Sequence, residues 1–135
     1  MEQLLHYVWK HKIFPLRKLQ TTFGLPLEII DPGLHNTNAG PDFFNAKIKI
    51  DETLWVGNIE IHTHSSDWKR HGHHKDKAYN SVILHVAEQT DCEVFRLNGE
   101  EIPQLHLPCP DNIRKHYDEL CQTEISPYCY SILRS

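Results

Sequence analysis

The sequence predicts an α/β domain with a mixed central β-sheet and flanking helices, and three patterns lead to this fold class. Residues 2–13 repeat apolar side chains at helical spacing, which predicts an amphipathic helix. Residues 43–50 and 54–63 alternate apolar and polar side chains, as strands with one buried face do. Residues 81–88 form a nearly continuous apolar run, which is typical of a strand at the centre of a sheet. This order of helix and strands indicates a mixed sheet with helices on its faces.

Turn and helix-breaking residues delimit the other expected elements. Pro15 ends the first helix, because a proline disfavours helical backbone at the residue before it. Asn98-Gly99 is a favoured hairpin turn and predicts that residues 92–97 pair with residues 102–107. The remaining expected elements are a short helix at 17–23 ended by Gly24, a strand at 27–30, a loop at 35–41, a connection at 51–53 and a short helix at 76–81.

The length of 135 residues suits one domain with one modest core. We expect a single α/β domain over residues 1–110. Residues 111–135 are expected to form a C-terminal helix, with Asp111 as its cap, and a tail that begins a longer architecture.

Composition narrows the expected location and partners. No apolar run approaches the length of a membrane span, and the N-terminal segment lacks the apolar core of a signal peptide. We therefore expect a cytoplasmic protein without membrane contact. The four cysteines form no Cys-x-x-Cys pair and are expected to be reduced thiols. The net charge of −4 argues against broad sequence-independent binding to nucleic acid, which depends on a basic surface.

Two carboxylates and a histidine form the strongest candidate site. Asp42 follows a Gly-Pro turn at the start of the strand 43–50. Glu60 and His62 are two residues apart in the next strand, so their side chains share a face. If the two strands pair as a hairpin, Asp42 lies near both. Two carboxylates beside a base are what a hydrolytic site with a divalent metal requires.

A plainer interpretation competes with this one. The Pro-Asp pair is then only a turn, and Glu60 and His62 form the polar outer face of a half-exposed strand. The opposite face of this strand is expected to be core, and it carries Trp55, Gly57, Ile59 and Ile61.

Histidines offer a second possible metal site. Imidazoles at His62, His64, His71 and His73 have spacings found in zinc or manganese sites, with His74 nearby and Asp67 or Asp76 as oxygen ligands. The alternative is a solvated loop that is rich in histidine. His85 lies within the apolar strand and is expected to be a hydrogen-bonded core histidine.

The segment that follows Trp68 is locally basic. A basic loop between aromatic residues suits contacts with a nucleic-acid backbone and stacking of a base. The alternative is a charged surface loop whose ends are packed by the aromatic residues Trp68 and Tyr79. The candidate substrate-binding residues are Asn36, Asn38, Trp68, Lys69, Arg70, Lys75 and Lys77.

The element order, the Pro41-Asp42 pair and Glu60-x-His62 resemble the restriction-endonuclease-like superfamily, whose motif is proline-aspartate followed by Asp/Glu-x-Lys. The resemblance covers residues 2–88. It implies a core of helix, three strands, helix and strand, in which Asp42 and Glu60 bind Mg²⁺ or Mn²⁺. His62 replaces the lysine and would position or deprotonate the attacking water. Because a histidine is not a permanent cation, a degenerate descendant is the alternative.

A more extensive resemblance covers most of the chain. The stretches 35–43, 57–62, 65–68 and 79–86 are similar to a bacterial family of unknown function. Members of that family are longer, which implies that this chain corresponds to their N-terminal part. The functional hypothesis is a metal-dependent phosphodiesterase acting on DNA or RNA. The alternative is a non-catalytic domain that binds nucleic acid or protein.

Overall fold

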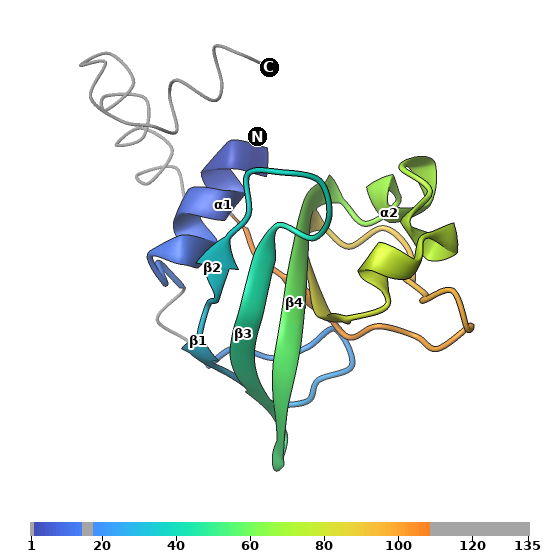
Figure 1. Ribbon diagram of the computed structural model, residues 1–135. Helices are drawn as coiled ribbons and strands as arrows, with labels where there is room; N and C mark the ends of the chain where they lie inside the picture. Colours follow the sequence, from blue (N-terminus) through green and yellow to red (C-terminus); the bar gives the residue numbers. More distant parts are fainter. Residues whose placement is uncertain (1, 15–17, 109–135) are drawn as a thin grey trace, which may run out of the picture.

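The computed structural model describes residues 2–14 and 18–108, which form a curled mixed β-sheet with few helices (Figure 1). The elements are α1 (Glu2–Lys10), β1 (Leu27–Asp31), β2 (Leu34–His35), β3 (Phe43–Ile50), β4 (Thr53–His64), α2 (Asp67–Arg70), the 3-10 turns η1 (His73–Lys75) and η2 (Lys77–Tyr79), β5 (Val82–Gln89) and β6 (Gln104–His106).

The strand order of the sheet is β1-β3-β4-β5-β6, and β2 pairs with β3 off this path. Pairs among β1, β3 and β4 are antiparallel, whereas β4, β5 and β6 run parallel to one another. The predicted class, a mixed sheet with helices, is confirmed. β4 joins the antiparallel and parallel halves, so residues on it can contact elements from both.

The two faces of β4 meet different layers. Ile59 and Ile61 belong to the main core, which includes Leu5 and Val8 of α1. Each such side chain contributes roughly 1.5–3 kcal/mol when fully buried. Because side chains alternate along a strand, Glu60 and the following even-numbered residues face the other way, toward α2 and η1. This second face carries the candidate site.

An irregularity in β3 lies directly beside Asp42. Phe43 pairs with Ile59 and Ala46 with Gly57, so β3 contains one extra residue at this point. The extra residue allows both Phe43 and Ala46 to be buried. Asn45 adopts a left-handed backbone conformation there, with φ of +58°. The sequence pattern did not predict this bulge.

Several expected elements are confirmed. The first helix, the strands near 27–30, 43–50 and 54–63, and the buried strand near 81–88 are all present. In β5 the residues from Val82 to Ala87 are all buried, as expected for a central strand. The expected helix at 76–81 is reduced to the 3-10 turn η2.

Two predictions were wrong. Residues 18–23 form no helix; Thr21 N–H donates to Leu25 O across a turn that contains Gly24. The predicted hairpin is limited to a short bridge between Phe95 and Glu101. The segment that follows pairs instead with β5 as β6, because that position buries Leu105 against the core. A parallel edge beside a buried strand offers more apolar contact than an isolated hairpin.

The restriction-endonuclease-like core is not confirmed. Between β4 and β5 the chain forms only one helical turn, α2, and two 3-10 turns, rather than a full crossover helix. The expected C-terminal helix and tail at 111–135 lie outside the described residues, and so do the proposed boundary near residue 110 and three of the cysteines. Cys92 is a free thiol. Within residues 2–14 and 18–108, no helix has the length and apolar character needed to cross a membrane.

Candidate metal centre

Asp42 and Glu60 contact one another although they are 18 residues apart in the chain. The backbone N–H of Asp42 donates to Glu60 Oε1 over 3.2 Å, and the N–H of Ile61 donates to Asp42 Oδ2 over 2.8 Å. The two carboxyl groups also lie close enough to shift each other's pKa. The antiparallel pairing of β3 with β4 therefore delivers Asp42 to Glu60, which is the expected proximity.

Three histidine rings lie close together on the same side of the sheet. They come from β4 (His62), from the residue after α2 (His71) and from η1 (His73). Their ring centroids are 5.1, 5.3 and 5.6 Å apart in pairs. One nitrogen from each ring lies within 4.8 Å of the other two, so this cluster could hold a metal ion.

Glu60 contacts two of these histidines. Its Oε2 lies 2.8 Å from His73 Nε2 and 3.4 Å from His62 Nε2. In a tetrahedral zinc site with bonds of about 2.0–2.1 Å, neighbouring ligand atoms are roughly 3.3 Å apart. The separation from His62 already suits such a site, whereas His73 and Glu60 are at a hydrogen-bond distance.

A further buried histidine supports His62 from behind. His62 Nδ1 lies 2.8 Å from His85 Nε2, and His85 is fully buried. Metal-binding histidines commonly use their second nitrogen in such a bond, which fixes the orientation of the ring. The prediction that His85 is a hydrogen-bonded core histidine is therefore confirmed, and this residue also contacts the site.

Aromatic residues hold His73 in place. Its ring stacks on Tyr79 with centroids 3.7 Å apart, and Trp68 meets it edge-on at 5.3 Å. Trp68 is only 1% exposed, and its Nε1 donates to Phe95 O. Trp68 was expected to bind substrate, but a buried indole has no free face on which a base could stack. It belongs instead to the small second core, with Tyr79, Val82, Val94 and Ile102.

Burial controls the charges of the histidines. It lowers the pKa of His62 to about 2 and the pKa of His73 to about 4, and neighbouring histidines add to the effect. Both rings are therefore neutral near pH 7, and each keeps a lone pair on one nitrogen. At this pH His62 cannot supply the positive charge that the lysine of the endonuclease motif supplies.

The pKa values of the two carboxyl groups are shifted in opposite directions. Burial, and then the charge of Asp42, raise the pKa of Glu60. Burial alone would raise the pKa of Asp42 as well, but contact with His6 and hydrogen bonds outweigh it and hold the pKa below its usual value. Without a cation the pair therefore carries its negative charge on Asp42 and its proton on Glu60.

His6 of α1 completes this side of the site. Its Nε2 lies 3.4 Å from Asp42 Oδ2, which is an ion-pair separation rather than a well-formed hydrogen bond. The same buried nitrogen makes no hydrogen bond within residues 2–14 and 18–108. Sequence reasoning missed His6, because only the packing of α1 against the sheet brings it to Asp42.

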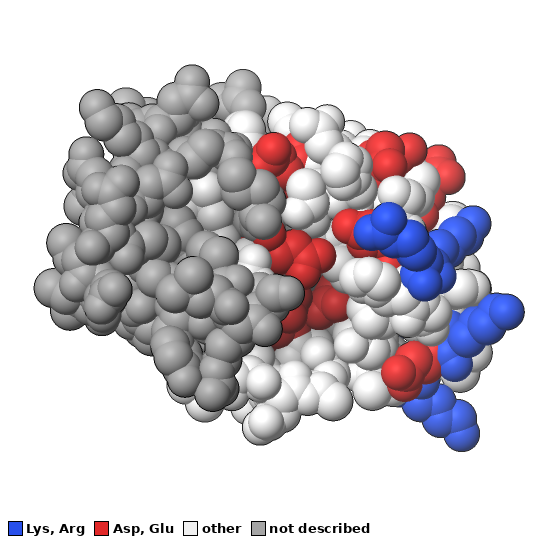
Figure 2. Space-filling model, turned by 90° about the horizontal axis from the view of Figure 1, so that it is seen from above, with Lys and Arg blue, Asp and Glu red and all other residues white. Residues whose placement is uncertain are grey.

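The segment that carries two of the clustered histidines also carries several basic side chains. Figure 2 shows Lys and Arg gathered along one edge of the face, while acidic side chains reach its middle. The predicted cations Lys69, Arg70, Lys75 and Lys77 are all exposed, and they belong to the segment that carries His71 and His73. Arg70 pairs with Asp67. Their role in binding substrate stays a prediction.

The other predicted residues lie around the cluster without joining it. Asn36 uses its side chain within its own loop, donating to Ala39 O and Pro41 O and accepting the N–H of Asn38. It shapes the turn before Asp42, and Asn38 is exposed. His64 was expected in the zinc set, but it is exposed at the end of β4 and outside the group of three histidines.

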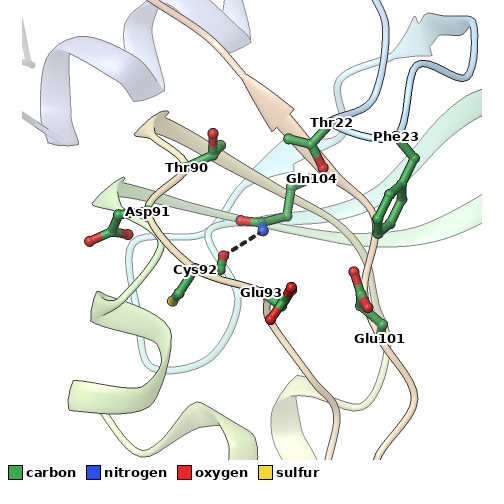
Figure 3. Close-up of a pocket in the computed structure, with 8 residues that line it drawn as sticks. All are labelled: Thr22, Phe23, Thr90, Asp91, Cys92, Glu93, Glu101 and Gln104. Atoms are coloured by element: carbon green, nitrogen blue, oxygen red, sulfur yellow. Dashed lines mark hydrogen bonds between the residues drawn. The ribbon is translucent and has the colours of Figure 1, made fainter.

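A cavity of about 440 Å³ lies away from the histidine cluster (Figure 3). Its lining is acidic and includes Asp91, Glu93 and Glu101, with Phe23 at one side. None of the three clustered histidines lines it. Gln104 is shared, because it lines the cavity and also hydrogen bonds to His85.

Together, fold and site define an α/β domain with a candidate metal centre made of a carboxyl pair and three histidines. The chain belongs to the family described as "Protein of unknown function (DUF2851)", whose model matches residues 2–135. No curated protein and no solved structure matches the chain. The expected family resemblance is confirmed, whereas the comparisons give no support to a resemblance to the nuclease superfamily.

Proposed function

We propose that this protein is a metal-dependent hydrolase that cleaves phosphodiester bonds, with His62, His71 and His73 as the metal ligands. One observation carries the proposal: three histidine nitrogens converge beside a carboxyl pair, on one face of the sheet. Metal-ligating imidazoles must be neutral, and the lowered pKa values of His62 and His73 meet that requirement.

The donor set favours a transition metal over Mg²⁺. Imidazole nitrogens suit Zn²⁺ and related ions, while Mg²⁺ prefers oxygen ligands and bound water. Zn²⁺ or Mn²⁺ therefore suits the three histidines better than Mg²⁺ does. The sequence had instead predicted an all-oxygen site at Asp42 and Glu60. Three protein ligands leave a fourth position, which is the arrangement of catalytic zinc sites.

The carboxyl pair supplies the acid–base chemistry. The ion, when bound, would polarise the phosphoryl group and make a nearby water more acidic. Glu60 lies beside the ligand nitrogens, so the positive charge of a bound ion would favour its ionised form, and that carboxylate would accept the proton of the attacking water. Asp42 keeps its negative charge and holds Glu60 through the backbone N–H bond. The neutral His62 acts as a ligand, not as a substitute cation.

The exposed cations suggest the substrate class. Lys69, Lys75 and Lys77 lie in the segment that carries two of the three ligands, so they would meet anionic groups that approach the ion. Nucleic acid is the polymer with regularly spaced phosphates that such a basic edge suits. The acidic surface elsewhere favours local contact over broad electrostatic binding.

Metal binding and cleavage can be tested separately. Protein purified without a metal column is analysed for bound elements, and DNA, RNA and bis(p-nitrophenyl) phosphate are assayed with Zn²⁺ and Mn²⁺. We expect one ion per chain and cleavage that is lost in Glu60→Gln while the ion is retained. Absence of stoichiometric binding, or equal cleavage by the variant, would contradict the proposal.

A second candidate is a non-catalytic domain that binds nucleic acid or protein around a structural ion. The lack of a permanent cation at His62 favours it, as does the closeness of Glu60, which would close the site as a fourth ligand. The same variant discriminates the two. In the structural case Glu60→Gln weakens metal binding, and the wild-type protein cleaves none of the substrates.

A further inference from the structure

Gln104 has only one orientation that satisfies its neighbours. Its Nε2 lies 2.8 Å from Cys92 O, and its Oε1 lies 2.6 Å from Ser65 Oγ and 3.0 Å from His85 Nδ1 (Figure 3 shows the first contact). A backbone carbonyl can only accept a hydrogen bond, so the amide nitrogen must face Cys92. The amide oxygen is left to accept from both Ser65 and His85.

This orientation sets the proton position on His85. Because Gln104 Oε1 only accepts, the hydrogen of His85 is on Nδ1, and its Nε2 carries a lone pair. The reverse tautomer would need Gln104 to turn, which would bring two oxygens together at the Cys92 carbonyl. A doubly protonated His85 is disfavoured, because it would place a full positive charge on a ring that is 0% exposed.

The same logic passes to His62. His85 Nε2 accepts, so His62 Nδ1 must donate across the 2.8 Å contact. The lone pair of the neutral His62 is then on Nε2, the nitrogen that lies 3.4 Å from Glu60 Oε2. The strand register holds this series of hydrogen bonds in place, since His85 pairs with Gln104 across β5 and β6. His62, His85 and Gln104 are each at most 5% exposed, so the bulk solvent has little access to these bonds.

We propose that His85 and Gln104 are positioning residues that hold His62 in the tautomer with its proton on Nδ1 and its lone pair on Nε2 facing the metal cluster. This inference rests on the proposed metal site for its function, but the tautomers are a property of the metal-free protein. Outer partners of this kind tune metal affinity by about 10- to 100-fold.

Nitrogen-15 NMR of the metal-free 135-residue protein at neutral pH tests the tautomers directly. Two-bond proton–nitrogen correlations distinguish a protonated from a bare ring nitrogen, and His62→Ala and His85→Ala assign the signals by their loss. We expect Nδ1 to be protonated and Nε2 bare in both rings. A proton on His62 Nε2 would overturn the proposal, whether or not the protein binds metal.

Two matched variants test the positioning role. Gln104→Leu removes the acceptor for His85, and we expect mixed His62 tautomers and a loss of Zn²⁺ affinity of about 10- to 100-fold. Ser65→Ala removes the other hydrogen bond to the same oxygen. It should leave the His62 tautomer populations and the Zn²⁺ affinity within about twofold of the wild-type values. Unchanged tautomers and affinity in Gln104→Leu would overturn the role.

The two proposals fail in different ways. Expected tautomers without Zn²⁺ binding would remove the proposed function alone, and Zn²⁺ binding with the opposite tautomer would remove only the positioning role. If Gln104→Leu does not fold, the tautomers measured in the wild-type protein still decide whether the positioning proposal holds.

Discussion

The first half of β4 exposes apolar residues, whereas its second half buries ionisable residues. In the first half Leu54, Trp55 and Val56 are 56%, 44% and 60% exposed. In the second half the ionisable residues Glu60 and His62 are only 4% and 2% exposed. The difference arises because β5 pairs with β4 only from Asn58 onward, so the first half pairs with β3 alone among the described strands.

This contrast shows that the position of a strand in the sheet decided burial more than its residue types did. Burying a carboxyl and an imidazole costs free energy unless partners compensate, and each of these groups has them. Buried ionisable groups beside an exposed tryptophan are the arrangement that the proposed site requires.

The largest expected effect comes from removing a ligand in the buried half. His62→Ala should lower Zn²⁺ affinity by more than about 100-fold, since loss of an outer partner alone costs about 10- to 100-fold. Competition with a chelating dye measures the change. His64→Ala, two residues along the same strand and exposed, is the matched control and should bind normally. Equal affinities in the two variants would place the ion elsewhere.

The boundary between the halves should be sensitive to size. A Cβ at Gly57 would lie 2.5 Å from Ile83 Cγ2 and 2.9 Å from Ser81 O, where β4 begins to pair with β5. We expect Gly57→Ala to lower the free energy of unfolding by about 1–3 kcal/mol, measured by urea denaturation. Combined with Ile83→Ala, the loss should be smaller than the sum of the single effects. Simple additivity would show that the predicted contact is not the cause.

The buried half should also give the metal-free protein an unusual pH dependence. His62, His73 and His85 have lowered pKa values, so their contribution to stability is complete above pH 6.5, the ordinary histidine pKa, and falls as the pH drops toward about 4. Glu60 has a raised pKa and acts in reverse. Its contribution is present below its ordinary pKa of 4.5 and is lost as the pH rises.

Thermal unfolding with a chelator present, from about pH 4 to pH 9, separates these opposing contributions. Between about pH 7 and pH 9, Glu60→Gln should lose less stability than wild type, because it has no carboxyl to ionise. Between pH 6.5 and pH 4.5 the variant should weaken more steeply than wild type, because it lacks the opposing contribution of Glu60, and below pH 4.5 the two proteins should weaken in parallel. Identical curves at alkaline pH would mean that Glu60 is already ionised in the folded protein.

The smallest effect is expected in the exposed half. Val56→Thr replaces one β-branched residue with another on a side chain that is 60% exposed. The free energy of unfolding should change by less than about 0.5 kcal/mol, and Zn²⁺ affinity should not change. A loss above about 1 kcal/mol would show that the tip of the β3–β4 ribbon is covered in solution.

Local patterns predicted the elements whose partners are sequence neighbours. The alternation in 43–50 and 54–63 predicted two strands, and the short connection between them predicted their antiparallel pairing. The patterns failed where a distant strand competed: β6 pairs with β5 instead of completing the predicted hairpin. Periodicity records which residues are apolar, but it does not say which edge of the sheet is vacant.

The site was predictable to a similar degree. Spacing brought Glu60 and His62 to one face, and the histidine-rich segment supplied His71 and His73. Trp55 was expected in the core, and the face of Glu60 was left open to solvent in the plainer interpretation; both expectations were wrong. His6 and Gln104 carry no local signal, because only the docking of α1 and the parallel pairing of β6 bring them to the site.

The parallel pairing of β4, β5 and β6 also bears on how the protein folds. Ser65 and Gln104 are 39 residues apart in the chain, yet their side chains hydrogen bond beside the histidines. Sheets dominated by such distant contacts belong to the slow-folding class, because the connecting loops must close before their contacts form. We therefore expect the histidine cluster to be assembled late in folding, so that an ion would bind a nearly complete fold. Its stabilising effect would then appear as slower unfolding, with little change in the rate of folding.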